Sequence, residues 1–306
     1  MAIRLAITMG DPAGVGAEVA LKALAQGGCP CEPVLIGPRS VWKAAAETFD
    51  LPLPRDIENI GDETAVYPRG VVDAACGRAA YEALMRAIEL ALAGEVDGIV
   101  TAPLNKASLH RAGIAESGHT EILARETAAS RHALMLYSPR IACAFVTCHQ
   151  SLASVPGSLT IEHVVDTVEL LHNTLKFIRG MKNHIAMLGL NPHAGEEGIF
   201  GDEEKTILIP AVHELRSRGI EISDPLPPDT AFTPEALKRF DGHVCLYHDQ
   251  GAIPFKMLSF DDGVNVTLGL PIVRTSPDHG TAFDIAWQGR ANPSSMAAAI
   301  ELAARL

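Results

Sequence analysis

The chain has 306 residues, of which 47% are hydrophobic, so it is long and apolar enough to bury a full core and is not expected to be disordered. Its formal charge of −12 at pH 7 excludes a general nucleic-acid surface, because such surfaces use Lys and Arg to neutralise phosphates. No stretch approaches the roughly 20 apolar residues of a membrane-spanning helix, and the N-terminus lacks a signal-peptide pattern. We therefore expect a soluble, cytoplasmic protein.

Short apolar runs alternate with longer helical patterns along the chain. "RLAIT" precedes "GAEVALKALA", "PVLIG" precedes "SVWKAAAETF", "VDGIVTAP" precedes a helix after Thr120, and "IACAFVT" precedes "IEHVVDTVELLHNTLKFI". This order predicts an α/β fold whose mixed or parallel sheets are covered by helices. The length suits two modest domains or one large one, and the pattern does not place a boundary inside 1–306. The stretch "DPLPPDT" at 224–230 is interpreted as a loop within a domain.

The segment "ITMGDPAGVGAEVALKAL" has the strand, Gly-rich turn and helix of a dinucleotide-binding unit, but the wrong spacing. Gly10, Gly14 and Gly16 form G-x-x-x-G-x-G, whereas the Rossmann fingerprint is G-x-G-x-x-G followed by an acidic residue at the end of a second strand. Gly14 and Gly16 therefore either face a ligand or only allow a sharp turn into the helix.

Three apolar segments each lead into a loop that carries a histidine. "IACAFVTCHQ" leads to His149, "IAMLGLNPHAGEEG" to His193 and "HVCLYHDQG" to His248. Three neutral imidazoles with an open position are typical of a catalytic metal site, and ligands bind at the carboxyl ends of strands in open α/β sheets. Alternatively, each histidine only caps its strand by hydrogen bonding.

A second group of residues is typical of an anion site. His119 and Thr120 begin a helical pattern in "SGHTEILARET", where free N–H groups and the helix dipole favour a phosphate, although a plain N-cap would look the same. Lys256, Asn265 and Arg274 lie around a later apolar run. Arg274 follows "GLPIV", so if buried it needs an anionic partner, which could be a ligand or a carboxylate of the protein.

These features describe an α/β enzyme with a metal site and an anion pocket. They leave open whether the enzyme is a hydrolase, an aldolase or a dehydrogenase.

Several segments of unusual composition follow one another over essentially the whole chain: "GDPAGVGAE", "TAPLNK", "SGHTE", "GLNPHAGEEGIFGDEE", "PPDTAF", "YHDQGAIPFK" and "GVNVTLGLPIVRTSPDHGTAFDIA". In this order they resemble the 4-hydroxythreonine-4-phosphate dehydrogenase family of pyridoxal phosphate synthesis. The resemblance implies a two-domain α/β fold related to isocitrate and isopropylmalate dehydrogenases. It also implies a homodimer with its active site at the interface, a divalent metal such as zinc, magnesium or cobalt, and NAD or NADP.

The resemblance also assigns roles to individual positions. The metal ligands would be His149, His193 and His248. The substrate would be bound by His119, Thr120, Lys256, Asn265 and Arg274. The stretch "DHGTAFDIAWQGRANP" is similar to the adenosine-binding loop of isopropylmalate dehydrogenases, which makes His279, Gly280, Thr281 and Asp284 the cofactor candidates. An Asp near a ribose favours NAD over NADP. Candidate proton carriers are Asp229, Asp249 and Lys106.

The family's reaction is the oxidation of 4-phosphohydroxy-L-threonine with decarboxylation to 3-amino-2-oxopropyl phosphate. The main alternative is a dehydrogenase of a 4-phosphorylated sugar acid, D-threonate or D-erythronate 4-phosphate. A metal-dependent hydrolase or a silent metabolite-binding protein comes after these. The chain departs from the family pattern at Pro277, at Trp287 and Gln288, and in "CHQSLASVPG". These changes lie near the anion loop, the cofactor loop and the first metal histidine, respectively.

Overall fold

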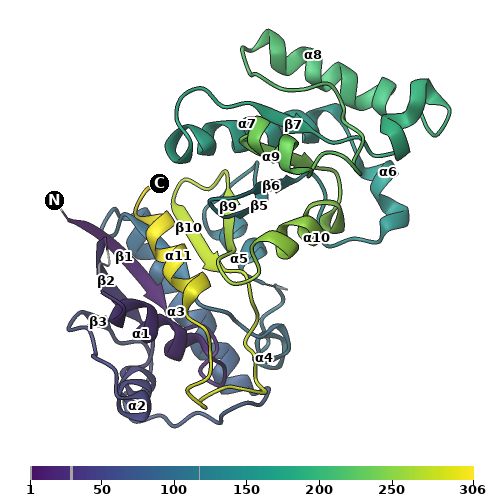
Figure 1. Ribbon diagram of the computed structural model, residues 1–306. Helices are drawn as coiled ribbons and strands as arrows, with labels where there is room; N and C mark the ends of the chain where they lie inside the picture. The colour runs from purple at the N-terminus through teal and green to yellow at the C-terminus, as the bar shows by residue number, and fades with distance from the viewer. Residues whose placement is uncertain (1, 28–29, 117) are drawn as a thin grey trace. The chain divides into compact units, whose positions relative to one another are not determined.

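The computed structural model describes residues 2–27, 30–116 and 118–306, so Ser117 of the "SGHTE" motif lies outside the described residues. The chain forms two compact units (Figure 1). Unit 1 comprises Met1–Ser130 and Leu270–Leu306, and unit 2 comprises Arg131–Gly269. Both units have strands with helices packed against them.

Unit 1 contains a sheet with the strand order β3-β2-β1-β4-β10, in which every described pairing is parallel. Its elements are β1 (Ile3–Thr8), α1 (Gly16–Ala25), β2 (Cys31–Ile36), α2 (Arg39–Phe49), β3 (Ile57–Glu58), α3 (Ala74–Leu92), β4 (Gly98–Thr101), α4 (Lys106–Arg111), α5 (His119–Glu126), β10 (Val273–Pro277) and α11 (Ser294–Ala303).

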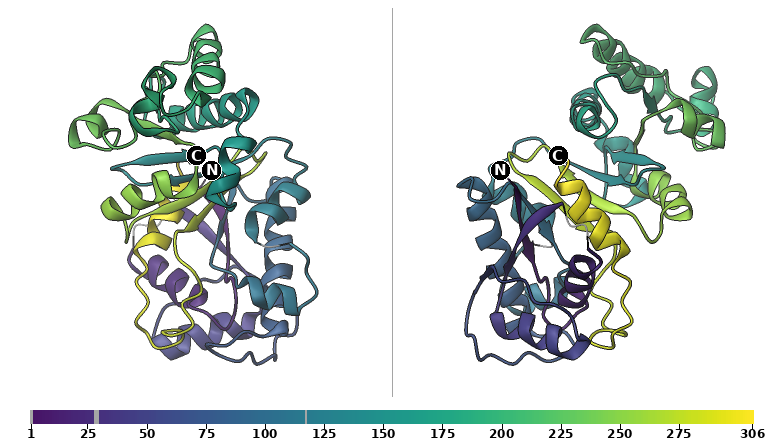
Figure 2. Two further views of the ribbon diagram at one scale, coloured as in Figure 1. Left: turned by 90° about the vertical axis from the view of Figure 1, so that its right-hand side faces the viewer. Right: turned by 60° about the vertical axis from the view of Figure 1, so that its left-hand side comes forward.

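The two faces of this sheet pack against different helices (Figure 2). Ala6, Ile36 and Ile99 belong to a buried apolar cluster with side chains from α3, α4 and α5. Alternate side chains of a strand point to opposite faces, and accordingly Thr275 donates its hydroxyl to the Ala299 carbonyl of α11, at 2.8 Å. Because both faces are covered, the strands read as continuous apolar runs in the sequence.

Unit 2 contains a mixed sheet with the order β9-β5-β6-β8-β7. β5 pairs antiparallel with β9 and β6, whereas β6, β8 and β7 are parallel. The elements of this unit are β5 (Ala133–Tyr137), β6 (Ala142–Phe145), η1 (Leu152–Ser154), α6 (Val155–Ser158), α7 (Ile161–Ile178), β7 (Ile185–Met187), η2 (Pro192–Gly198), η3 (Glu204–Leu208), α8 (Ile209–Ser217), α9 (Pro234–Arg239), β8 (Gly242–Cys245), α10 (His248–Leu258) and β9 (Val264–Leu268).

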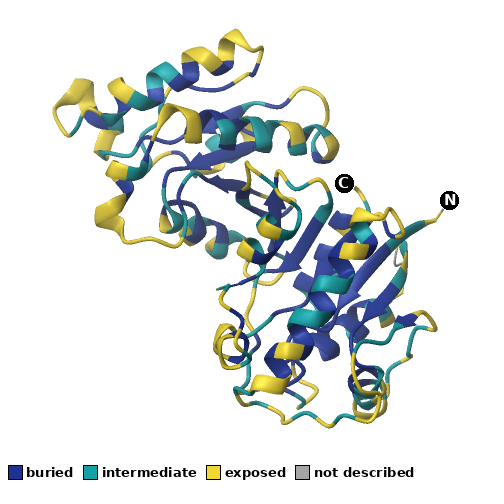
Figure 3. Ribbon diagram, turned by 180° about the vertical axis from the view of Figure 1, so that it is seen from behind, coloured by how far each residue is buried: buried dark blue, intermediate teal, exposed yellow. Residues whose placement is uncertain are grey.

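The core of unit 2 lies between the strands and α10. Phe145 of β6, Cys245 of β8 and Phe255 of α10 are fully or almost fully buried in one apolar cluster. Figure 3 shows the strands of both units as mainly buried, with exposed residues on the outer faces of the helices. The predicted fold class, α/β with mixed sheets covered by helices, is confirmed, and the helices predicted at 16–25 and 161–178 begin and end at those residues.

A buried histidine anchors the loop that contains "PPDTAF" to β8. The ring of His243 stacks on Phe232, with ring centroids 4.9 Å apart, and its Nε2 lies 3.1 Å from the Ala231 carbonyl oxygen. Burial lowers the pKa of His243 to about 4. Hydrogen bonding to backbone groups raises the pKa and offsets part of this shift. The side chain is therefore neutral at physiological pH and donates from Nε2.

In the part of the chain that the structure describes, no helix combines the length and the apolar character that crossing a membrane requires.

The shifted pKa of His243 predicts a loss of stability in acid. Above about pH 6.5 the histidine is neutral in both states, whereas between pH 6.5 and 4 only the unfolded chain takes up the proton. The free energy of unfolding should therefore decrease as the pH is lowered through this window, by about 3 kcal/mol in total from this group. Urea unfolding of His243→Gln at pH 7.5 and 4.5 should show a smaller acid loss than wild type. The same substitution at exposed His132 is the control, and an undiminished acid loss in His243→Gln would contradict the assignment.

Candidate active site

His149 and His248 lie side by side because their strands are neighbours. β6 and β8 pair in parallel, with Phe145 opposite Cys245, so both strands end at the same edge of the sheet. His149 follows the end of β6 and His248 begins α10 directly after β8. The two imidazole centroids are 5.7 Å apart, with the rings inclined at 37°. The predicted convergence at a carboxyl edge therefore holds for this pair.

The geometry of the pair fits two ligands of one divalent cation. Imidazole nitrogens lie about 2.0–2.1 Å from bound zinc, which places the centroids of two tetrahedral ligands roughly 5 Å apart. His248 Nδ1 lies 2.7 Å from Asp249 Oδ1, which leaves Nε2 to face a metal. A carboxylate on the second ring nitrogen is the usual way that proteins orient a metal-binding histidine. Asp249, a predicted proton carrier, is thus placed to orient the His248 ring.

Two buried polar side chains brace the strand ends that carry these histidines. Thr147 donates its hydroxyl to the Leu246 carbonyl, at 2.6 Å, and so joins the exit of β6 to the exit of β8. Gln250 accepts from the Leu246 amide and donates to the Gly189 carbonyl, both at 2.7 Å. Because Gly189 follows β7, Gln250 links the His248 segment to the segment that leads to His193. This explains why a buried strand is followed by "HDQ".

His193 lies in an unusual left-handed turn. Residues 193–197 all have φ between 42° and 81°, although only one of them is glycine. Such conformations cost non-glycine residues on the order of 1 kcal/mol each, so the surrounding structure must hold them.

Glu204 holds the start of this turn. Its buried carboxylate accepts from the backbone amides of Leu190 and Asn191, both at 2.8 Å, and from Asn191 Nδ2 at 2.9 Å. Among the described residues, no three His, Cys, Asp or Glu side chains are gathered closely enough to hold a metal ion. The structure of one chain therefore brings together two of the three predicted metal ligands, and does not place His193 with them.

A cavity of about 540 Å³ opens beside the histidine pair. It is lined by Cys148, His149, Gln150, Ser151, Leu152, Val155, Tyr247, His248 and Asp249. Six of these residues belong to the segment "CHQSLASVPG", which is expected to depart from the family pattern. Burial raises the pKa of the Cys148 thiol to about 12, so this group is a neutral wall of the cavity and not a nucleophile.

The predicted anion site of unit 1 is built around a buried arginine. Arg274 is only 3% exposed, and its Nε and Nη2 donate to the hydroxyl of Thr101, at 3.1 and 2.8 Å. Burial lowers the pKa of Arg274 to about 9, so the guanidinium keeps its charge at neutral pH. The pKa of His119 is lowered well below its ordinary value by burial and by the charge of Arg274, so His119 is neutral.

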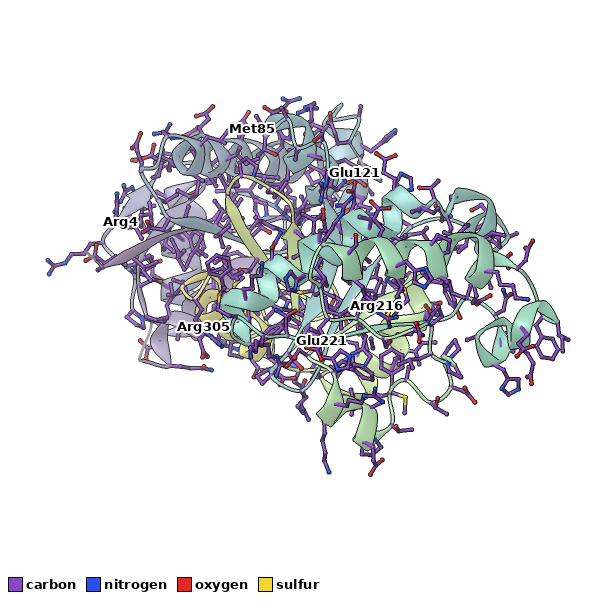
Figure 4. All side chains as sticks on the ribbon, turned by 90° about the horizontal axis from the view of Figure 1, so that it is seen from above. Arg4, Met85, Glu121, Arg216, Glu221 and Arg305 are labelled. Atoms are coloured by element: carbon purple, nitrogen blue, oxygen red, sulfur yellow. The ribbon has the colours of Figure 1, made fainter. Side chains whose placement is uncertain are left out.

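The remaining anion candidates are divided between the two units. In unit 1, His119 and Thr120 occupy the first turn of α5. The next residue of this helix, Glu121, is labelled in Figure 4. Lys106 begins α4, and its Cε lies 3.7 Å from the position that a Cβ on Gly118 would take. Unit 2 contains the other two candidates: Lys256 on α10, above the ring of Phe260, and half-buried Asn265 on β9.

The predicted cofactor loop packs against the Gly-rich turn. The Val15 amide donates to the Thr281 carbonyl at 3.1 Å, and a Cβ on Gly14 would lie 2.9 Å from the same oxygen. A Cβ on Gly16 would clash with the Met9 carbonyl. Both glycines therefore serve close packing, which favours the turn interpretation. Thr281 is buried by this contact, whereas His279, Gly280 and Asp284 are exposed.

Trp287, one of the departures from the family pattern, anchors the far side of this loop. Its indole Nε1 donates to the Pro12 carbonyl at 2.9 Å, and the guanidinium of Arg69 lies 4.1 Å from the ring centroid. Trp287 thus contacts both the Gly-rich turn and Arg69 within unit 1. The other two expected departures in unit 1 are Pro277, which is buried at the end of β10, and Gln288, which is exposed.

Some residues of the site were not identified from the sequence. Thr101, Thr147, Glu204 and Gln250 act through hydrogen bonds to distant segments, and their partners depend on strand order. The available signal was their position directly after apolar runs, or within the motifs "TAPLNK", "GDEE" and "YHDQG". Asp229, the remaining predicted proton carrier, is exposed in the loop that His243 anchors.

Comparison with known proteins agrees with the resemblance found in the sequence. The family model described as pyridoxal phosphate biosynthetic protein PdxA matches residues 30–303. The chain is 42% identical to a D-threonate 4-phosphate dehydrogenase of Pectobacterium atrosepticum, over 99% of this chain and 98% of that protein. It is 43% identical to a 4-hydroxythreonine-4-phosphate dehydrogenase of Desulfosudis oleivorans, over 98% and 94%.

A solved structure shows the same similarity in three dimensions. The crystal structure of a 4-hydroxythreonine-4-phosphate dehydrogenase from Klebsiella pneumoniae superposes with a TM-score of 0.88 at 41% identity, and covers 100% of this chain and 99% of its own. The family model spans most of the chain, and relatives that match over nearly their full length are more than 40% identical to it. The chain therefore belongs to the PdxA family.

Proposed function

We propose that the protein is a metal- and NAD(P)-dependent dehydrogenase that oxidises the 3-hydroxyl of a 4-phosphorylated acid and releases its carboxyl group as carbon dioxide. The observation that carries the proposal is the His149–His248 pair beside a cavity of about 540 Å³. For 4-phosphohydroxy-L-threonine, the first-choice substrate, the product is 3-amino-2-oxopropyl phosphate.

The chain's own groups supply binding and orientation. His149 and His248, with His193 as the third ligand, would hold a divalent cation, and Asp249 would keep the His248 ring oriented. Arg274, with the neutral His119 and the N–H groups that begin α5, offers a positive site for the phosphate. Lys256 and Asn265 would complete the substrate contacts. When bound, the cation would supply Lewis-acid chemistry and the nicotinamide would supply a hydride acceptor.

The residues of the cofactor loop would bind the dinucleotide. Exposed His279, Gly280 and Asp284 follow β10, and the loop is held by the Thr281 and Trp287 contacts to the Gly-rich turn. Asp284 would accept from a ribose hydroxyl, which favours NAD over the 2′-phosphate of NADP. Lys106 and Asp229 remain the candidates for moving protons in the reaction.

We further propose that the active form is a homodimer whose second copy completes each metal site. Only two of the predicted ligands are paired within one chain, although the strained turn at His193 is held firmly. Large exposed apolar side chains also accompany all three histidines. They are Leu152 beside His149, Ile199 and Phe200 beside His193, and Ile253, Met257 and Phe260 on and after α10. We infer that these exposed apolar side chains belong to the proposed interface.

A D-threonate 4-phosphate dehydrogenase is the second candidate function. Relatives with that name match the chain as closely as those named for 4-hydroxythreonine 4-phosphate, at 42–43% identity. Both substrates carry a 4-phosphate and a secondary hydroxyl on C3, so the phosphate site and the metal pair would serve either one.

A direct assay separates the two substrates. The protein is supplied with a divalent metal and NAD, and NADH formation is measured with 4-phosphohydroxy-L-threonine, D-threonate 4-phosphate and D-erythronate 4-phosphate. We expect turnover of 4-phosphohydroxy-L-threonine with a higher kcat/KM than of either sugar acid. Selective turnover of a sugar-acid phosphate would keep the mechanism and move the protein to the second candidate function. Absence of NADH or NADPH formation with all three would contradict the proposal.

Replacement of a metal ligand gives the second test. His248→Ala removes one of the paired imidazoles, so we expect metal content to fall and kcat to drop by roughly a hundredfold or more, while the chain stays folded. Metal is measured by elemental analysis, and folding by circular dichroism. His213→Ala, at an exposed position on α8, is the control. Wild-type metal content and kcat in His248→Ala would remove the histidine pair from the metal site.

A further inference from the structure

Gln250 is a buried amide side chain in the first turn of α10, two residues after His248. Both ends of its amide are hydrogen-bonded to backbone groups. The Oε1 atom accepts from the Leu246 amide and Nε2 donates to the Gly189 carbonyl, both at 2.7 Å. A half-turn of the amide would set its NH2 group against an N–H and its oxygen against a carbonyl oxygen, so these partners permit one orientation of the side chain.

This side chain joins two strand exits past the point where their backbones pair. The pairing of β7 with β8 reaches Leu188, whose amide still donates to a carbonyl of β8, at 3.2 Å. Beyond this point, the exit of β8 leads to His248 and the exit of β7 leads to the turn that contains His193. The hydrogen bond from Gln250 to Gly189 links the two exits.

The segments that this amide joins are closely packed. A Cβ on Gly251 would lie 2.5 Å from Cys245 Sγ, so the first turn of α10 rests directly on the end of β8. A Cβ on Gly189 would lie 2.9 Å from Ala194 Cα, in the turn that contains His193. Close backbone contacts therefore set the place of each segment, and the amide fixes one segment against the other.

The Leu246 peptide group is held on its other side as well. Its carbonyl accepts from the Thr147 hydroxyl at 2.6 Å, and Thr147 lies two residues before His149. Leu246 is fully buried, and side chains from the segments of the two paired histidines bond to its N–H and to its C=O. Without the amide of Gln250, two buried backbone groups would lose these hydrogen bonds, which favours movement of the strand exits.

We infer that Gln250 is a positioning residue for the metal centre, which holds His248 where a bound divalent cation requires it. The inference rests on the proposed function, in which His248 is a metal ligand. Because Gln250 is buried and bonds to backbone groups at both ends, it acts through the position of the strand exits and not by contact with the metal. Replacement of residues that orient metal ligands changes metal affinity by roughly ten- to one-hundredfold.

The test uses Gln250→Met, which keeps the length of the side chain and removes both hydrogen bonds. Metal-free wild type and variant are prepared by dialysis against EDTA. They are titrated with Zn²⁺ in competition with a chromogenic chelator, and with Co²⁺ while its visible absorption is recorded. We expect Gln250→Met to raise the Kd for Zn²⁺ roughly ten- to one-hundredfold and to change the Co²⁺ spectrum, which reports the geometry of the ligands.

Ser259→Ala is the matched structural control. Ser259 is also buried and directly follows α10, so its hydroxyl, which lies 2.7 Å from the Ser138 hydroxyl, holds the opposite end of the same helix. This variant should lose stability in a thermal melt while keeping the wild-type Kd and Co²⁺ spectrum. If Gln250→Met fails to fold, Gln250→Asn takes its place, because the shorter amide cannot reach both partners.

The variant His248→Ala separates failure of the inference from failure of the proposed function. Loss of Zn²⁺ binding in His248→Ala, with a wild-type Kd and Co²⁺ spectrum in Gln250→Met, would overturn the role of Gln250 and leave the metal site in place. An equal rise of Kd in Ser259→Ala would overturn it as well, because the effect would then follow general stability. Wild-type Zn²⁺ binding in His248→Ala would instead reject the metal site itself.

Discussion

The parallel pairing of β6 with β8 is the constraint on which the candidate metal site depends. Parallel strands end at the same edge of a sheet, so two segments about a hundred residues apart in sequence deliver His149 and His248 to neighbouring positions. Thr147 and Gln250 then join the strand exits to each other and to the exit of β7. A shift of one residue in the pairing would turn these side chains to the wrong face and separate the imidazoles.

The second constraint is the cost of burying a positive charge. Arg274 is almost fully buried in unit 1, and burial lowers its pKa to about 9, because a charged guanidinium loses solvation there. His119, made neutral by the same surroundings, adds hydrogen-bonding capacity without repulsion. The candidate metal ligands thus lie in unit 2, whereas the candidate phosphate-binding arginine lies in unit 1.

The sequence predicted the parts of this account that depend on local pattern. Buried strands read as apolar runs, and polar residues that follow such runs stand out, which is why His149, His248 and Arg274 were identified. Contacts set by strand order were not predictable: the hydrogen bond from Arg274 to Thr101 joins residues that lie 173 positions apart in the sequence. The turn at His193 was equally hidden, because propensities do not predict five successive left-handed residues. The role of Gly14 and Gly16 stayed open until Thr281 and Met9 were found against them.

The most direct test of the central claim is anomalous diffraction from crystals of the protein grown with a divalent metal, measured at the absorption edge of that metal. The account predicts a peak within bonding distance of the His149 and His248 nitrogens, with His193 of the same or a second copy as a further ligand. A metal bound elsewhere, with these two imidazoles making no contact to it, would contradict the account.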